Sequence, residues 1–213
     1  MSPDGIIFDF DGVLVDSVDV KTQAFRALFM NEKQHLAEIL DFHLANGGMS
    51  RFAKFEYIHR EILKKDLSDE RARFLGNEFS RLVMQKVIEC PSMPGALEFI
   101  RKYYLRMPLF IVSATPEREL REIVSKRGLS TFFREVHGAP RNKSEIICNI
   151  LDRNHLTAGM VPFVGDEIND YLASVEAGTP FFAYSVDGRQ DTFPPQATIV
   201  HTFSELEKQL FRS

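Results

Sequence analysis

Short apolar runs alternate with amphipathic stretches along most of the chain. The runs are bounded by turn residues and have the length of buried strands. They cover residues 6–10, 109–113, 135–137, 161–165 and 181–184. Apolar residues recur at helical spacing over 116–127, 143–154 and 168–177. Strands that alternate with helices predict an α/β fold, a Rossmann-like parallel sheet with helices on both faces.

One region interrupts this alternation. From about residue 18 to residue 89 the pattern is helical and carries no strand signal. We expect helices over 19–30, 50–64 and 69–89. Pro91 and Pro94 then break the chain. The pattern therefore predicts an inserted helical domain over 18–89, between the parts 1–17 and 90–213 of an α/β core. We expect the phenylalanines of the insert to form its core rather than an aromatic ligand site, namely Phe25, Phe29, Phe42, Phe52, Phe55, Phe74 and Phe79.

Composition narrows the class of protein further. Of 213 residues, 44% are hydrophobic, which excludes a disordered chain, a collagen-like repeat and a disulfide-stapled miniprotein. The net charge is −4 and no basic run is present, which argues against a general nucleic-acid binder. Cys90 and Cys148 stand far apart, and we interpret them as reduced, buried small side chains. No secretion signal or membrane span is visible, so we expect a cytoplasmic location. We also expect a monomer or a weak dimer that binds neither nucleic acid nor membrane.

Two acidic groups follow apolar strands. Asp9 and Asp11 are spaced i, i+2 at the end of the first strand, so both side chains point to one side. Gly12 then allows a turn and a close approach to a ligand. Asp166 and Asp170 follow a later strand at helical i, i+4 spacing. Carboxylates this close repel one another unless a cation relieves them, and Mg²⁺ prefers such oxygen ligands.

Two further signals lie between the acidic groups. Ser113, Ala114 and Thr115 end a strand just before a predicted helix, whose N-terminus favours anions. Lys143 stands at the start of another helix. Taken alone, Ser113 fits a helix cap or a turn, and Lys143 fits a solvated surface. The six histidines show no metal-ligand spacing, so we treat them as structural or surface residues.

In their order along the chain these residues resemble the four motifs of the haloacid dehalogenase superfamily. The motifs are Asp9-Phe10-Asp11-Gly12-Val13, Ser113, Lys143 and Gly165-Asp166-Glu167-Ile168-Asn169-Asp170. The helical insert is similar to the cap of the branch that contains phosphoglycolate phosphatases and β-phosphoglucomutases. The resemblance implies that Asp9 is the nucleophile and that Asp11 acts as general acid and then as general base. We expect the negative neighbours of Asp11 to help it hold its proton.

The resemblance also implies the ligands of the site. Mg²⁺ would contact the side chains of Asp9 and Asp166 and the main-chain carbonyl of Asp11. Asn169 and Asp170 would lie in the outer shell, with Asp170 acting through water or holding Lys143. Ser113 and Lys143 would contact the phosphoryl group, together with Gly12, Ala114 and Thr115. We expect Glu167 to be an exposed acid at a helix start, and Arg141 remains an alternative to Lys143.

The insert carries the question of substrate. Arg51 follows a glycine turn and resembles the arginine with which β-phosphoglucomutases bind a second phosphate. Lys21, ten residues beyond Asp11, is a second possible anion contact or a surface lysine. Pro116-Glu117 departs from the lysine and asparagine of the mutases, and we expect Glu117 to repel a second phosphate.

These residues predict a Mg²⁺-dependent phosphatase for a small phosphorylated metabolite. The presence of Asp11 argues against dehalogenation, because a halide leaving group needs no proton. A phosphosugar mutase remains one alternative. A catalytically silent binding or regulatory protein on the same fold remains another, although all four aspartates of the motifs are retained.

Overall fold

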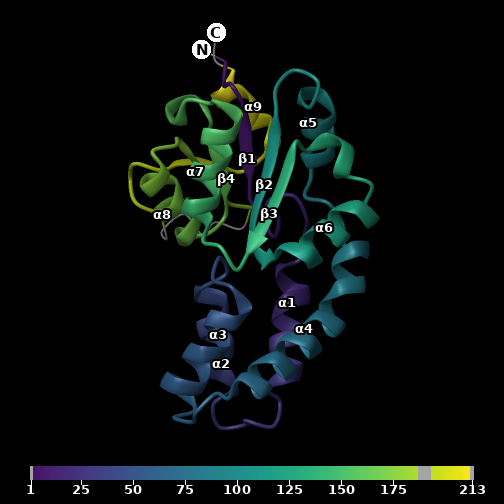
Figure 1. Cartoon of the computed structure of the whole chain (residues 1–213), viewed down its shortest axis with the longest axis vertical. Coiled ribbons are helices and arrows are strands. Elements are labelled where there is room, and N and C mark those ends of the chain that lie inside the picture. Colours follow the sequence, from purple (N-terminus) through teal and green to yellow (C-terminus); the bar gives the residue numbers. More distant parts are fainter. Residues whose placement is uncertain (1, 187–192, 212–213) are drawn as a thin grey trace.

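The computed structural model describes residues 2–186 and 193–211, and a parallel sheet of six strands lies at the centre of these residues (Figure 1). The strand order is β3-β2-β1-β4-β5-β6. The strands are β1 (Ile6–Phe8), β2 (Leu109–Pro116), β3 (Glu135–Ala139), β4 (Phe163–Gly165), β5 (Phe181–Tyr184) and β6 (Thr198–Val200). The predicted fold class is confirmed.

Helices cover both faces of the sheet. Alternate residues of each strand point to opposite faces, so a buried parallel strand presents apolar side chains on both. In β1, Ile7 joins the apolar cluster beneath α7 (Lys143–Asn154) and α8 (Ile168–Ala177). Phe8 points the other way and packs with Phe99 of α5 (Ala96–Tyr103) and Phe203 of α9 (Phe203–Leu210). The helix α6 (Glu117–Lys126) follows β2.

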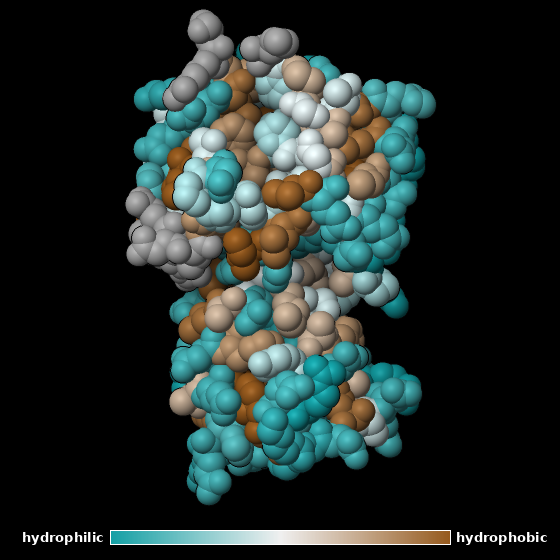
Figure 2. All heavy atoms as spheres, turned by 90° about the vertical axis from the view of Figure 1, so that its left-hand side faces the viewer, coloured by the Kyte–Doolittle hydropathy of each residue, from teal (hydrophilic) through white to brown (hydrophobic). Residues whose placement is uncertain are grey.

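The helices of residues 18–89, here called the cap helices, lie beyond the carboxyl ends of the strands (Figure 1). They are α1 (Val18–Leu28), α2 (Leu36–Ala45), α3 (Arg51–Tyr57) and α4 (Asp69–Glu89), with a π-helical turn (Ile58–Ile62) after α3. Figure 2 shows a narrower waist between them and the sheet part. This arrangement leaves room for a site where the strands end; the predicted division into two domains stays a prediction.

The cap helices bury most of their phenylalanines against one another. Phe25, Phe29, Phe55 and Phe79 are at most 2% exposed, as a helical core requires. Phe52 and Phe74 are 41% and 52% exposed, so the prediction of a buried position is wrong for these two. The ring of Phe52 instead covers Gly76, where a Cβ atom would lie 2.7 Å from it.

Several elements carry too weak a pattern to predict. The sequence predicted α4, α7 and α8 at their observed bounds, but gave no signal for α5, α9 or β6 and none for α2 as a separate helix. β1 and β4 are shorter than predicted and β2 is longer. Both cysteines are free thiols, and Cys90 is half-buried. Cys148 lies on the outer face of α7 and is exposed, so its predicted burial is wrong. No helix in the described part of the chain is both long and apolar enough to cross a membrane.

Candidate active site

Asp9 stands at the carboxyl end of the central strand. Its N–H donates to the carbonyl of Val164 over 2.8 Å, which continues the pairing of β1 with β4 by one residue. The residue is only 4% exposed. Burial and the charges of Asp170 and Asp11 raise its pKa to about 7, although Lys143 opposes the shift. A carboxylate in this position needs a further cation nearby to stay ionised at neutral pH.

The carboxylate of Asp11 has more hydrogen-bond donors around it than that of Asp9. Its carboxylate accepts hydrogen bonds from Lys21, from Ser17 over 2.5 Å and from Thr115 over 3.1 Å. Burial disfavours the charged form, but the ion pair with Lys21 and these hydrogen bonds outweigh it and lower the pKa of Asp11. The expectation that its neighbours help Asp11 to hold a proton is therefore wrong for this state of the site. Among the groups that lower the pKa of Asp11, the ammonium of Lys21 on α1 contributes most.

Lys143 links two of the acidic residues. The Asn142 side chain accepts from the N–H of Glu145 over 2.7 Å and so caps α7, which places Lys143 in its first turn. The Lys143 ammonium lies 2.5 Å from Oδ1 of Asp170 and 3.1 Å from Oδ2 of Asp9. Burial favours the neutral amine, but the two carboxylates raise the pKa of Lys143. Lys143 is thus a buried cation beside Asp9, and the predicted contact of Asp170 with Lys143 is present.

The start of α8 presents the second acidic group. Glu167 and Asp170 form a reciprocal capping box, in which Oδ2 of Asp170 accepts from the N–H of Glu167 over 3.2 Å. Glu167 is therefore half-buried at the edge of the site rather than exposed as predicted, because it caps the helix. Asp166 follows β4, and carboxylate oxygens of Asp9, Asp166 and Asp170 all lie within 4.8 Å of one another.

This acidic group fits a metal ion. Oδ1 of Asp9 and Oδ1 of Asp166 are buried and have no hydrogen-bond partner. Burial and the charges of Asp9 and Asp170 raise the pKa of Asp166 well above its usual value. A hard cation between the two orphaned oxygens would satisfy both and remove the repulsion.

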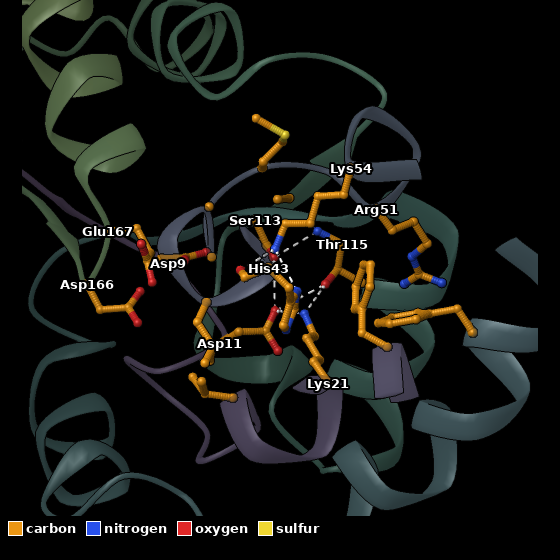
Figure 3. A pocket seen from close by; sticks show the side chains of 18 residues that line it. Asp9, Asp11, Lys21, His43, Arg51, Lys54, Ser113, Thr115, Asp166 and Glu167 are labelled. Carbon is orange, nitrogen blue, oxygen red and sulfur yellow. Dashed lines mark hydrogen bonds and ion pairs between the residues drawn. The ribbon is translucent and has the colours of Figure 1, made fainter. Parts of the chain in front are cut away.

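A cavity of about 60 Å³ lies between this cluster and the cap helices (Figure 3). From the sheet part it is lined by Asp9, Asp11, Ser113, Ala114, Thr115, Asp166 and Glu167, and from the cap by residues that include Lys21, His43, Gly47, Gly48, Arg51 and Lys54. Ser113 is 1% exposed, and its hydroxyl accepts from the N–H of Thr115 over 3.1 Å. Asn169 lies to one side, against Gly48 of the cap. The structure thus brings all the predicted site residues to one region, except that the Arg141 guanidinium pairs with Glu117 instead.

Arg51 lines the cavity, but its guanidinium already holds a carboxylate. Ser50 caps α3 by accepting from the N–H of Ala53, which sets Arg51 at the first position of the helix. Arg51 donates to both oxygens of Glu119 on α6, over 2.6 and 3.0 Å, and to Ser80 of α4 over 2.7 Å. The guanidinium also lies 4.4 Å from the centre of the Phe79 ring. This ion pair joins the cap helices to the sheet part.

Glu117 does not face the site as the sequence suggested. Its carboxylate accepts from Arg121 over 2.9 Å and from Arg141 over 2.8 Å, and it lies 3.3 Å from His137. Burial alone would raise the pKa of Glu117, but these partners lower it to about 2. The predicted repulsion of a second phosphate by Glu117 is wrong, because α6 turns this carboxylate toward β3 and points Glu119 toward Arg51.

Sequence reasoning missed two basic residues of the cavity. Lys54 lies one helical turn after Arg51, and its Nζ lies 3.0 Å from Nδ1 of His43 and donates to the His43 carbonyl over 3.1 Å. Lys54 and His43 are 2% and 5% exposed. The signal for Lys54 was its position three residues after Arg51; nothing local marks His43, whose partner comes from another helix.

The chain resembles known proteins along most of its length. Residues 6–184 match the model of the haloacid dehalogenase-like hydrolase family. A phosphoglycolate phosphatase from Psychrobacter arcticus is 26% identical over 187 residues, which cover 81% of this chain and 79% of that protein. A phosphorylated carbohydrates phosphatase from Thermotoga maritima is 24% identical over 180 residues, 82% of each chain. A hydrolase from Bacillus subtilis, solved with magnesium bound, shares the fold with a TM-score of 0.73 and 17% identity over 99% of both chains.

Proposed function

Because the chain belongs to the haloacid dehalogenase-like hydrolase family, we propose that it is a Mg²⁺-dependent phosphatase acting on a small phosphorylated metabolite. The observation that carries this proposal is the meeting of Asp9, Asp11 and Asp166 at one cavity, with two buried carboxylate oxygens that lack partners. Relatives named as phosphatases of phosphoglycolate and of phosphorylated carbohydrates support the same reaction.

We assign the metal to Asp9 and Asp166, with Asp170 behind them, because their oxygens meet and two of them are unsatisfied. The main-chain carbonyl of Asp11 is a further proposed ligand. Mg²⁺, when bound, would neutralise the charge of the phosphoryl oxygens and of the two aspartates. The magnesium in the B. subtilis neighbour supports this choice of ion.

The reaction then uses the carboxylates of Asp9 and Asp11 in two steps. Asp9 attacks phosphorus in line, the bond from phosphorus to the leaving oxygen breaks, and Asp11 gives that oxygen a proton. Water next attacks the aspartyl phosphate, Asp11 takes a proton from it, and the bond from Asp9 to phosphorus breaks. Inorganic phosphate leaves, and Asp9 is regenerated.

The remaining side chains hold the phosphoryl group. The Ser113 hydroxyl and the Lys143 ammonium lie beside Asp11 and Asp9, respectively, where they can contact phosphoryl oxygens. Lys21 keeps Asp11 ionised before substrate binds, which is the form that accepts a proton from water. The proton for the leaving group must therefore reach Asp11 when the substrate enters.

Neither alternative is favoured by a specific contact. A mutase needs a group that holds a second phosphate, and the arginine expected for this purpose is bound to Glu119. A silent binding protein would not need Asp9, Asp11 and Asp166 to converge on one cavity. The cytoplasmic location and the monomeric or weakly dimeric state stay predictions.

The test is phosphate release from a panel of phosphomonoesters, with Mg²⁺ and with excess chelator. We expect release only with the metal, and a phosphorylated Asp9 that borohydride traps under turnover. Asp9→Asn should abolish both signals, whereas Asp16→Asn, an exposed aspartate of the same loop, should keep them. Activity that survives in Asp9→Asn would refute the proposal.

A further inference from the structure

A buried ion pair joins the start of α3 to α6. Arg51 donates to both carboxylate oxygens of Glu119, and the two side chains are only 5% and 10% exposed. Ser80 of α4 accepts from Arg51 over 2.7 Å and donates to Glu119 over 2.6 Å, so it links both partners. The guanidinium also lies over the ring of Phe79. Glu119, on the sheet part, thus takes its hydrogen bonds from two cap helices.

The charged end of Arg51 is committed to this contact. A guanidinium binds a carboxylate through two parallel hydrogen bonds, the same geometry that it would use for a phosphate. An anionic group of the substrate would have to displace Glu119 and leave that carboxylate without its cation. In Figure 3, Arg51 lies at the far end of the cavity from Asp166. Arg51 therefore serves the contact between the cap helices and the sheet part.

The two segments that connect the cap helices to the sheet part are held together independently of this ion pair. The N–H of Asp16 donates to the carbonyl of Pro91 over 3.0 Å, and Val15 forms an antiparallel bridge with Ser92. Arg127, which follows α6, donates to three main-chain carbonyls at the end of α4 over 2.8 to 2.9 Å. These segments form a pivot that can stay intact while the cap helices turn.

The cavity is small and covered by the cap. Its volume of about 60 Å³ corresponds to a few water molecules. Gly47 and Gly48 pack against side chains of the sheet part, because Cβ atoms on them would lie 2.2 Å from Glu167 and 3.0 Å from Asn169. A phosphomonoester therefore needs the cap helices to move away from the sheet part before it can enter.

From these contacts we propose that Glu119 is a positioning residue that, through Arg51 and Ser80, holds the cap helices closed over the cavity. Arg51 is then part of a latch and not a contact of the substrate. The identity of the site rests on the proposed function, but the latch is a property of the chain without substrate. Closure also brings Lys21 of α1 to the carboxylate of Asp11.

The latch can open because neither partner needs to stay buried when the two separate. Arg51 and Glu119 belong to opposite sides of the contact, so opening returns both charges to water and recovers their hydration. The net contribution of such a pair is therefore modest. A single substitution in the latch should shift the ratio of open to closed molecules on the order of tenfold, as expected for a hydrogen bond to a charged group.

The first test measures the distance between the cap helices and the sheet part without substrate. Cys148 is exposed on α7, Lys33→Cys places a second thiol at an exposed position of the cap, and Cys90→Ser removes the remaining thiol. Single-molecule energy transfer between dyes on the two thiols should show one dominant population. In Glu119→Gln a second population should increase at least tenfold relative to the first. Glu122→Gln, exposed on the same helix, should leave the distribution unchanged.

The second test separates a latch from a substrate contact by the direction of two effects. In a latch, Arg51→Met and Glu119→Gln each raise KM for the best phosphomonoester by a similar factor, because fewer molecules are closed. The double variant then raises KM no further. If Arg51 contacts substrate, Arg51→Met raises KM, whereas Glu119→Gln frees the guanidinium and lowers KM.

An unchanged distance distribution in Glu119→Gln, or opposite changes in KM for the two variants, overturns the latch. If Glu119→Gln does not fold, Ser80→Ala carries the same distance prediction with a severalfold increase, because it removes one donor to Glu119. The distance measurement needs no turnover. Absence of phosphate release from every phosphomonoester would therefore refute the phosphatase function, while the distances alone decide the latch.

Discussion

A Cβ atom on Gly12 would lie 2.1 Å from Oδ2 of Asp166. The two residues belong to loops that follow neighbouring strands, β1 and β4. Gly12 also has a φ of +79°, a left-handed conformation that other residues adopt with strain. The missing side chain therefore makes room for the proposed metal ligand and allows the turn that follows Asp11.

Gly12→Ala should weaken metal binding more than it weakens folding. The backbone strain costs about 1–2 kcal/mol, while the methyl group forces Asp166 away from Asp9. We expect the Mg²⁺ concentration for half-maximal activity to rise at least tenfold, as measured by titration of phosphate release. Gly159→Ala is the matched control, because its Cβ would meet no atom within 4 Å. An unchanged Mg²⁺ requirement in Gly12→Ala would show that Asp166 does not need this space.

Lys143→Met should destabilise the protein in a pH-dependent way. Lys143 is the cation between Asp9 and Asp170, and removal of one partner from a buried ionic cluster costs about 3–5 kcal/mol. Lys143 lowers the pKa of Asp9, so loss of the cation raises that folded-state pKa further, and the variant loses stability as pH rises toward it. Urea unfolding with chelator present should show a larger deficit at pH 8 than at pH 5. A deficit independent of pH would point to lost packing instead.

The sequence predicted the sheet side of this site because each of its signals is local. An apolar strand followed by Asp9, or by Asp166, places a carboxylate at a sheet edge whatever the rest of the chain does. Lys143 likewise stands at the first position of the helix that the apolar spacing over 143–154 predicts. A parallel sheet then brings these ends together, which is why these predictions agree with the geometry.

The cap side could not be predicted in the same way. Arg51 and Glu119 are separated by 68 positions, and their contact exists only because the folded chain brings the start of α3 to α6. Glu117 and Glu119 are two residues apart on one helix, so only the orientation of α6 decides which carboxylate meets Arg51. The charge state of Asp11 depends in the same way on Lys21, which α1 brings in from the cap.

Lys21→Met should shift the pH dependence of the first chemical step. Without the neighbouring cation the pKa of Asp11 rises, because the ion pair with Lys21 no longer stabilises the carboxylate. A general acid works only while protonated, so kcat/KM for an alkyl phosphate falls as pH rises above that pKa. In the variant this fall should occur at higher pH. An aryl phosphate, whose leaving oxygen needs less protonation, should show a smaller shift, and equal shifts for both substrates would argue against Asp11 as the acid.

The final prediction concerns Lys54 and the stability of the protein itself. Burial, reinforced by the charge of Lys21, lowers the pKa of Lys54 to about 7, although Glu167 and Asp11 oppose the shift. His43, its direct neighbour, has a pKa lowered to about 3 by burial and by Lys54, so it stays neutral above pH 6. Between pH 7 and the usual lysine pKa, the unfolded chain therefore binds one more proton at this position than the folded chain. Stability attributable to Lys54 must then rise with pH in this range.

Lys54→Met removes this dependence. The free energy of unfolding of the variant minus that of the wild type should fall by about 2–3 kcal/mol between pH 6 and pH 9. The measurement is urea unfolding of both proteins across this range, with chelator present and with Lys33→Met as the control whose difference stays flat. A flat difference for Lys54→Met would mean that Lys54 is charged throughout this range and already has a counter-ion.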